Sequence, residues 1–280
     1  MFNIKKLYWK YNHKFFWNVI APIKWLLFQP SKRDPNTELN FSIGIVTYKA
    51  RYEKYFQDLI RKLCLIFPDA EIIIMINGYY DEAMQREYLG KITKQLDAYS
   101  NVKYFTQEKP TGLSKLWNQI ILNSKHESVF ILNDDIRITP GFRKDLIHVN
   151  KNDVCLINNS WSHFLITKQL VEKNGWFDER LTGVGNEDMD YEFRMIINEL
   201  PINSVISKNL KNEVELTTDF SYGKTEKVVN KKYSAANWEF FKTKWDVSDN
   251  KFDNSIYSGK FNVYFSKKSK LETPDFYSKR

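Results

Sequence analysis

The first half of the chain alternates short apolar runs with longer amphipathic segments. Four runs have the length and apolar content of buried strands: 41–48 (FSIGIVTY), 71–76 (EIIIMI), 102–105 (VKYF) and 129–132 (VFIL). Between them, apolar residues recur at helical spacing in 51–67, 81–99 and 111–121. Strands that alternate with helices predict an α/β fold with a mostly parallel central sheet flanked by helices.

The second half has a different pattern and predicts a smaller half of the same domain. Residues 154–157 and 164–166 have the composition of strands, and 168–173 is typical of a short helix. A glycine-rich loop at 183–185 leads into a helix that we expect to continue to about residue 200.

Polar residues follow the predicted strands at their carboxyl ends. The first strand ends in Thr47-Tyr48, the second is followed by Asn77-Gly78, and the fourth by Asn133-Asp134-Asp135. In an open parallel sheet these ends border one crevice, where ligands bind. Neither Gly-x-Gly-x-x-Gly nor a P-loop follows any strand, which argues against a nicotinamide dehydrogenase and a P-loop enzyme.

Asp134 and Asp135 are adjacent carboxylates at the end of a buried strand. They repel each other and resist burial, so packing alone would not select them. A divalent cation would remove this conflict, because hard cations take carboxylate oxygens and can bridge them to phosphate. The structural alternative is a turn, in which Asn and Asp are common.

Three acidic residues, Glu187, Asp188 and Asp190, cluster in the first turn of the helix that follows the glycine-rich loop. Acids at a helix N-terminus gain about 0.3–1 kcal/mol from the helix dipole, and Asn186 is a suitable cap, so a structural role is one reading. Three acids exceed what capping requires. The other reading is a general base that faces the crevice.

The net charge of +8 is unevenly distributed. Residues 1–33 carry seven basic residues and no acidic one, and residues 260–280 are also basic, which leaves the middle of the chain slightly acidic. The central domain is therefore not a nucleic-acid platform, and we expect no nucleic-acid partner. Cys64 and Cys155 lie among apolar residues, which favours reduced core cysteines and a cytoplasmic location.

Residues 1–33 interleave their bases with tryptophans and other aromatic residues. The most apolar stretch, 15–28, is too short and too interrupted to span a bilayer, and it lacks a signal-peptide cleavage site. A basic, Trp-rich amphipathic segment suits peripheral contact with an anionic membrane, on its cytoplasmic face. The alternative is that these aromatic residues pack on the domain itself.

The expected organisation has three parts. Residues 1–35 form a basic aromatic extension, 40–246 the main domain, and 247–280 a basic tail. Within the main domain, 40–140 and 150–246 form the two halves.

Six motifs within residues 41–246 resemble, in the same order, those of family 2-type glycosyltransferases with the GT-A fold. They are the first strand with its following basic residues (IVTYKARYEKY), Asn77-Gly78, 112–118 (GLSKLWN), Asn133-Asp134-Asp135, 175–194 (GWFDERLTGVGNEDMDYEFR) and 233–245 (YSAANWEFFKTKW). An Asp-x-Asp motif alone is weak evidence, whereas six ordered motifs are specific. The resemblance implies a GT-A (Rossmann-like) fold with a nucleotide-sugar half and a smaller acceptor half.

The resemblance also implies an activity: an inverting hexosyltransferase of the bacterial surface-glycan type, acting in polysaccharide biosynthesis. The donor is expected to be a UDP-sugar, and the acceptor a hydroxyl of a glycan or of a lipid-linked molecule. Asp135 would ligate Mn²⁺ or Mg²⁺, Asp188 would be the general base, and Glu187 would position the acceptor. The residues expected to contact substrates are Thr47, Tyr48, Asn77, Gly112, Lys115, Asn118, Asn133, Asp134 and Trp176.

The chain departs from the family pattern at two points. Asn133 replaces the first carboxylate of the metal motif, which leaves Asp135 as the direct ligand and Asp134 facing the nucleotide ribose. The histidine ligand of some GT-A enzymes has no match, because no His follows His163, which is expected in the core. The main alternative is a catalytically inactive GT-A-like scaffold that binds nucleotide or glycan. A lipid- or nucleic-acid-binding protein and a nucleotidyltransferase are weaker alternatives.

Overall fold

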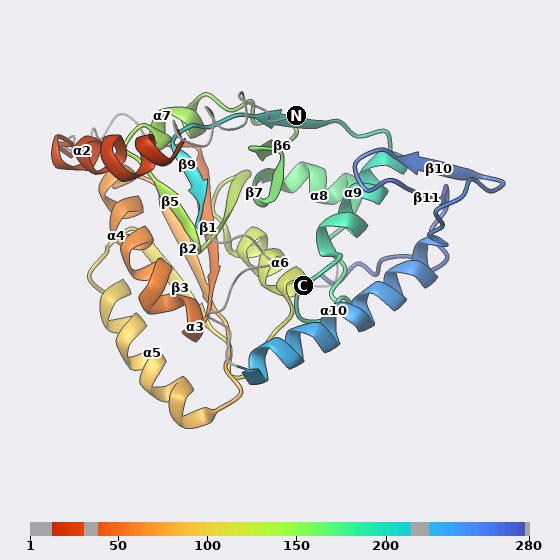
Figure 1. The fold of residues 1–280 in the computed structure, drawn as a ribbon, viewed down its shortest axis with the longest axis horizontal. Coiled ribbons are helices and arrows are strands. Elements are labelled where there is room, and N and C mark those ends of the chain that lie inside the picture. Colours follow the sequence, from red (N-terminus) through yellow and green to blue (C-terminus); the bar gives the residue numbers. More distant parts are fainter. Residues whose placement is uncertain (1–12, 31–38, 214–223, 278–280) are drawn as a thin grey trace, which may run out of the picture.

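The computed structural model describes residues 13–30, 39–213 and 224–277, with the backbone alone for 224–233. Its centre is a seven-stranded sheet with the order β3-β2-β1-β4-β7-β6-β8 (Figure 1). The strands are β1 (Phe41–Thr47), β2 (Glu71–Ile76), β3 (Val102–Thr106), β4 (Ser128–Asn133), β6 (Val154–Ile157), β7 (Ser160–Thr167) and β8 (Ile202–Val205). β3, β2, β1 and β4 are parallel, whereas β7 is antiparallel to β4 and to β6. The predicted α/β class with a mostly parallel sheet is confirmed.

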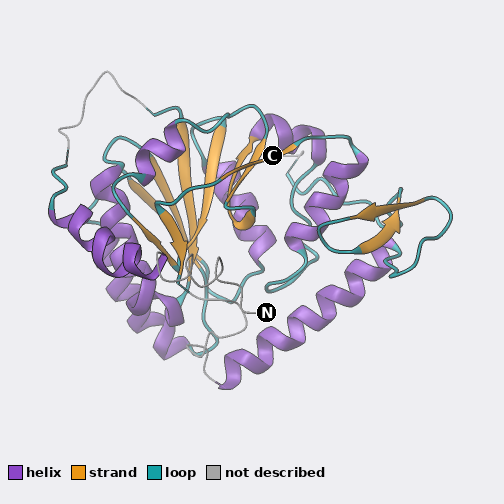
Figure 2. Ribbon diagram, turned by 45° about the horizontal axis from the view of Figure 1, so that its top comes forward, coloured by secondary structure: helices purple, strands orange, loops and turns teal. Residues whose placement is uncertain are grey.

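Helices cover both faces of this sheet (Figure 2). One face packs on α4 (Gln57–Ile66), α5 (Glu82–Leu96) and α7 (Phe142–Ile147), and the other on α6 (Leu113–Asn123), α8 (Lys168–Asn174) and α9 (Glu187–Ile197). β2 shows why both faces are apolar: Ile72, Ile74 and Ile76 belong to the first core, and Ile73 and Met75 to the second. The predicted helix 51–67 begins earlier, as α3 (Lys49–Arg51) and a π-helical turn, η2 (Tyr52–Phe56), that leads into α4.

Gly44, in the middle of β1, lets α6 approach the sheet closely. A Cβ atom at this position would lie 2.1 Å from Cγ2 of the fully buried Ile120. Gly44 pairs with Ile73 of β2 on one side and Ile131 of β4 on the other, so it lies at the centre of the sheet. The distance between α6 and β1 is therefore set by the missing side chain at residue 44.

The second half adds a third core around α9. It lies between α9, the long helix α10 (Lys224–Trp245) and a hairpin of β10 (Ser255–Ser258) and β11 (Val263–Ser266) (Figure 2). Phe193 of α9 stacks on Phe265 of β11 with ring centroids 3.7 Å apart, and Phe241 and Trp245 of α10 enclose the pair. Residues 247–280, expected as a tail, thus contain a hairpin that packs on the acceptor half. A second small sheet pairs β5 (Ile136–Ile138) with β9 (Leu210–Asn212).

A short helix lies on the outside of the domain, beside α4 and β5 (Figure 1). It consists of the π-helical turn η1 (Phe16–Ile20) and α2 (Ala21–Leu26). Trp17 and Ala21 are buried, and Trp25 Nε1 donates to the carbonyl oxygen of Ile138 at 2.9 Å. One face of this segment therefore packs on the domain, as the alternative interpretation expected. Residues 1–12 and 31–38 lie outside the described chain. Within the described chain, no helix has the length and apolar character needed to cross a bilayer.

Candidate active site

The ends of β1 and β4 bring predicted donor-site residues to one edge of the sheet. Thr47 ends β1 and is fully buried, and Asn133 ends β4 beside Val46 of β1. Asp134 and Asp135 follow directly and expose only 2% and 5% of their surface. Two carboxylates are thus held almost out of water at the edge where the sequence predicted a ligand crevice.

Arg51, the last residue of α3, supplies positive charge to both carboxylates. Its Nη1 atom lies 2.9 Å from Asp134 Oδ1 and 3.1 Å from Asp135 Oδ2. Its guanidinium also lies over the ring of Tyr48, 5.7 Å from the centroid. Burial nevertheless raises the pKa of Asp134, because desolvation outweighs the attraction of Arg51. Arg51 was not among the site residues predicted from sequence; the available signal was a basic residue four positions after the end of β1.

The carboxylate pair fits a divalent cation that is shared with a substrate. Among the residues that the structure describes, no group of three or more His, Cys, Asp or Glu side chains could hold a metal alone. In nucleotide sites Mg²⁺ is commonly held by one or two carboxylates together with phosphate oxygens. Asp134 and Asp135 already converge on one positive group, so their oxygens suit that arrangement. His163 is buried within the sheet, and desolvation lowers its pKa to about 4, as expected of a core histidine.

Asn77 and Gly112 connect this edge to the acceptor half. The Asn77 side chain donates to Thr111 O at 3.0 Å and accepts from Thr111 N at 2.8 Å, which fixes the approach to α6. At Gly112 a Cβ atom would lie 3.0 Å from the carbonyl oxygen of Leu181. The next amide, Leu113 N, donates to Gly183 O at 2.8 Å. Hydrogen bonds therefore lead from the end of β2 to the glycine-rich loop.

The backbone of this loop adopts conformations that glycine favours. The φ angles of Gly183, Gly185 and Asn186 are 69°, 121° and 69°, in the left-handed region that Gly adopts readily and Asn tolerates. Asn186 makes no side-chain capping hydrogen bond to the first turn of α9. Asn186 thus lies at the N-cap position without the side-chain hydrogen bond that the structural reading implied, and the loop is shaped by its backbone.

Glu187 and Asp188, the predicted catalytic pair, begin α9. Glu187 is buried and its Oε2 accepts from Gly185 N at 2.6 Å, whereas Asp188 is partly exposed and accepts from Met189 N at 2.9 Å. Burial, followed by repulsion from Asp188, raises the pKa of Glu187 to about 8. Burial also raises the pKa of Asp188. The pair therefore holds a proton more tightly than two ordinary carboxylates do.

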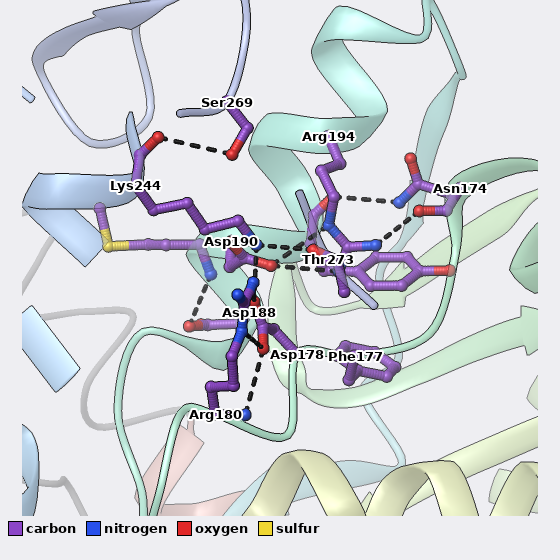
Figure 3. A network of polar contacts seen from close by, with 12 residues as sticks. Asn174, Phe177, Asp178, Arg180, Asp188, Asp190, Arg194, Lys244, Ser269 and Thr273 are labelled. Carbon is purple, nitrogen blue, oxygen red and sulfur yellow. Dashed lines mark hydrogen bonds and ion pairs between the residues drawn. The ribbon is translucent and has the colours of Figure 1, made fainter. Parts of the chain in front are cut away.

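Asp190, two residues further on, has a different environment (Figure 3). Its Oδ1 accepts from Lys244 Nζ at 2.6 Å and Trp245 Nε1 at 2.8 Å, and its Oδ2 lies 3.1 Å from Arg194. Lys244, which is completely buried, also contacts Asp178 Oδ2 at 2.8 Å. This network was not predicted from sequence, although Lys244 and Trp245 end the motif at 233–245.

Asp178 completes the network and lies in the turn before the glycine-rich loop. Arg180 Nη2 donates to Asp178 Oδ2 at 2.7 Å, and Lys244 binds the same oxygen. These cations hold the pKa of Asp178 at about 2, although burial acts in the opposite direction. The two acids and their bases therefore fasten the end of α10 to the first turn of α9 and to the 178–180 turn.

Asn237 of α10 holds the glycine-rich loop directly. Its side chain accepts from Thr182 N at 3.0 Å and donates to Thr182 O at 2.7 Å and Gly185 O at 2.8 Å. It is the Asn of the motif YSAANWEFFKTKW, so its motif membership was the available signal. The role of α10 is thus to brace the loop and turn that carry Glu187 and Asp188.

The other residues that were predicted to contact substrates differ in burial. Asn118 is fully buried and holds the 177–179 turn, donating to Phe177 O at 2.9 Å and accepting from Phe177 N at 3.0 Å. Lys115 lies exposed on α6. Trp176 packs against Tyr277, with ring centroids 4.7 Å apart. The structure thus brings Thr47, Tyr48, Asn133, Asp134 and Asp135 together, and links Asn77 and Gly112 to the acid turn.

Two solved structures are similar to this chain. Residues 1–349 of TarS from S. aureus share 18% identity, with a TM-score of 0.45 over 60% of this chain and 58% of that one. The mannosyltransferase PcManGT from Pyrobaculum calidifontis, in complex with GDP-Man and Mn²⁺, shares 12% identity, with a TM-score of 0.47 over 74% of this chain and 66% of that one. The chain thus spans less than two thirds of either protein. No curated protein sequence matches it.

The family model for glycosyl transferase family 2 matches residues 42–159. This segment begins in β1, ends just after β6, and includes Asn77-Gly78, the segment 112–118 and Asn133-Asp134-Asp135. The match agrees with the motif order and with the mostly parallel sheet expected of a GT-A fold. Residues 42–159 of the chain therefore match glycosyl transferase family 2.

Proposed function

We propose that the protein is an inverting glycosyltransferase that moves a hexose from a nucleoside-diphosphate sugar, a UDP-sugar, to a hydroxyl of a glycan or lipid-linked acceptor. The observation that carries this proposal is the pair Glu187–Asp188. The pair lies at the start of α9, behind the glycine-rich loop, and the pKa values of both acids are raised. Hydrogen bonds through residues 111–113 link that loop to the edge of the sheet that carries Asp134 and Asp135. A base for one proton, beside an edge that can hold a cation and a nucleotide, is what sugar transfer requires.

Donor binding is assigned to the edge formed by β1, β2 and β4. Thr47 and Tyr48 would line the nucleotide-base end, and Asp134 would face the ribose. The diphosphate needs positive charge, which Arg51 supplies from within the chain. Asn77 and Gly112 shape the wall of the site through the backbone of 111–113.

Asp135 would hold Mn²⁺ or Mg²⁺ together with phosphate oxygens. When bound, the ion would neutralise the charge that develops on the leaving diphosphate. Arg51 contacts a carboxylate oxygen that such a cation needs, so its guanidinium would have to share or release Asp135. After release, the Arg51 side chain would remain beside the diphosphate.

The acceptor half would supply the base. Glu187, with a pKa near 8, is protonated at neutral pH, and Asp188 is the partly exposed member of the pair. Asp188 would take the acceptor hydroxyl proton as the acceptor oxygen bonds to the anomeric carbon. The bond from that carbon to the phosphate oxygen breaks, the nucleoside diphosphate leaves, and attack from the opposite side inverts the carbon.

The location belongs to the same proposal. Cys64 and Cys155 are free thiols, and burial raises the pKa of Cys64 to about 12, so it is unreactive. Free, inert thiols agree with a reducing cytoplasm. A position on the cytoplasmic face of a membrane would place the active site near a lipid-linked acceptor.

The direct test is release of nucleoside diphosphate from a panel of nucleotide sugars, with Mn²⁺ and with chelator. It compares wild type, Asp135→Ala and Asp188→Asn, with Asp249→Asn as an exposed control. We expect metal-dependent turnover of one donor that is lost in the first two variants and kept in the control. No turnover of any donor, with nucleotide affinity unchanged in Asp135→Ala, would instead indicate the inactive binding scaffold.

A further inference from the structure

A stripe of exposed apolar side chains runs along the outer face of the helix formed by η1 and α2. Phe15, Val19, Ile23, Leu26 and Leu27 are exposed by 57%, 40%, 45%, 84% and 74%. The first four are spaced by three or four residues, which places them on one side of the helix, and Leu27 follows Leu26 at the helix end. They are among the most exposed large hydrophobic residues of the described chain, and they lie within 13 residues of sequence. Such a concentration marks a surface that is covered by a partner.

The opposite face of this helix is fixed to the domain, so the stripe is held outward. Trp17 and Ala21 are buried, and the Trp25 indole donates to Ile138 O at 2.9 Å. Lys62 of α4 lies over the Trp25 ring, 5.5 Å from the centroid. Rotating the helix to bury Leu26 and Leu27 would expose both tryptophans. The stripe is therefore a preformed surface that faces away from the domain.

The charge around the stripe indicates what covers it. Lys14 and Lys24 are exposed on the same helix, and residues 1–33 carry seven basic residues with no acid. A second copy of the chain would bring like charges together across the interface. A bilayer with anionic lipids offers both an apolar interior and negative charge, and each Lys or Arg near it strengthens binding about fivefold.

We propose that Phe15, Val19, Ile23, Leu26 and Leu27 form a membrane-docking face that inserts into the surface of an anionic bilayer. The helix lies in the plane of the interface with its basic residues at the headgroups, while Trp17 and Trp25 hold the domain to it. This inference rests on the helix alone and does not depend on transferase activity. It gives the molecule one fixed face toward the membrane.

The test is flotation of the full chain with vesicles of phosphatidylcholine alone and of phosphatidylcholine with phosphatidylglycerol. The wild type is expected to float only with the anionic vesicles. In the double variant Leu26→Ser/Leu27→Ser the affinity should fall by at least about tenfold, because two fully insertable side chains are lost. Ile206→Ser is the matched control, since Ile206 is 71% exposed elsewhere on the surface.

The outcomes separate membrane docking from the other occupants. Loss of flotation in the double variant, with unchanged melting temperature and unchanged Ile206→Ser binding, supports the docking face. A wild type that stays off anionic vesicles, or a double variant that binds them as well as wild type, overturns it. A wild-type dimer in light scattering that the double variant abolishes, without vesicle binding, assigns the face to a second copy instead. Donor turnover in detergent-free solution is a separate readout that tests the transferase proposal alone.

Discussion

Asp188 and Asp190 lie two residues apart in the first turn of α9, yet their environments are opposite. Asp190 is fully buried and surrounded by Lys244, Arg194 and the Trp245 indole. Glu187 and Asp188 form no ion pair with any described residue, and burial raises both pKa values. The comparison shows how one turn can be both anchored and reactive: one acid is neutralised to fix the turn, and its neighbours keep their affinity for a proton.

The strand-end carboxylates lie between these extremes. Asp134 and Asp135 share the counter-ion Arg51, and burial still raises the pKa of Asp134. Asp178 and Asp190, by contrast, share the fully buried Lys244 and each contacts an arginine as well. The three acid pairs thus differ in the positive groups that contact them.

The largest expected effect is on catalysis, in Asp188→Asn. The isosteric amide cannot accept a proton, so turnover should fall by about 10²–10⁴-fold with little change in melting temperature. In wild type, kcat/KM should rise with pH at values above the ordinary range of an aspartate, because the base must be ionised and burial raises its pKa. Nucleoside-diphosphate release across pH measures both. A variant with full activity would remove Asp188 from the mechanism.

The next effect is on stability, in Lys244→Met. Removing a fully buried cation leaves Asp178 and Asp190 under-compensated, which should cost about 3–5 kcal/mol of unfolding free energy. The control is Lys242→Met, since Lys242 pairs with Glu239 at the surface of the same helix, and it should cost at most about 1 kcal/mol. Urea titration measures both variants. Equal losses would contradict the assigned anchoring role.

A smaller effect is expected at the donor edge in Arg51→Met. Without its guanidinium, Asp134 and Asp135 should bind Mn²⁺ more tightly in the absence of nucleotide, by about tenfold or more. Mn²⁺ should also raise the melting temperature of the variant more than that of wild type, because it replaces a lost counter-ion. Isothermal titration and thermal unfolding check this, with Lys49→Met as the neighbouring control. Unchanged or weaker Mn²⁺ binding in Arg51→Met would exclude competition between Arg51 and Mn²⁺ for these carboxylates.

The smallest expected effect is a pH-dependent difference in stability between Glu187→Gln and wild type. The native pKa of Glu187 is about 8 against an ordinary value of 4.5, so the native state binds its proton more tightly than the unfolded state. The stabilisation that Glu187 contributes to the wild type is therefore complete below pH 4.5 and is lost as the pH rises through 8. The glutamine variant lacks this pH dependence. Its unfolding free energy should therefore rise relative to that of wild type by at least about 1 kcal/mol, the equivalent of one pKa unit, between pH 4.5 and 8. A difference that stays constant with pH would contradict it.

The sheet was predictable from sequence because its strands are buried on both faces. Runs such as EIIIMI need no tertiary information to be recognised, and Asp134-Asp135 stand out after one of them. The edge strands of the second half were not predicted, because β8 and β9 are short and half exposed, with little apolar content. The acid turn was found because three acids exceed the need of a helix end.

The counter-ions could not be found in the same way. Arg51, Lys244 and Arg194 lie among many bases in the sequence, and only the fold shows which of them face acids. Lys244 lies 54 residues after Asp190, and nothing in either local pattern pairs them. Asn237 was visible only as part of a motif whose structural purpose, bracing the loop at 182–185, depends on the position of α10.

Gly44 has a consequence for how this sequence can vary over time. A single added methyl group there meets Ile120, and α6, which carries Ile120, begins at the Leu113 amide that holds Gly183. Alanine at residue 44 would thus require a smaller residue at 120 or a shift of α6 away from β1. Residues 44 and 120 are therefore expected to change together in evolution, although neither takes part in the reaction.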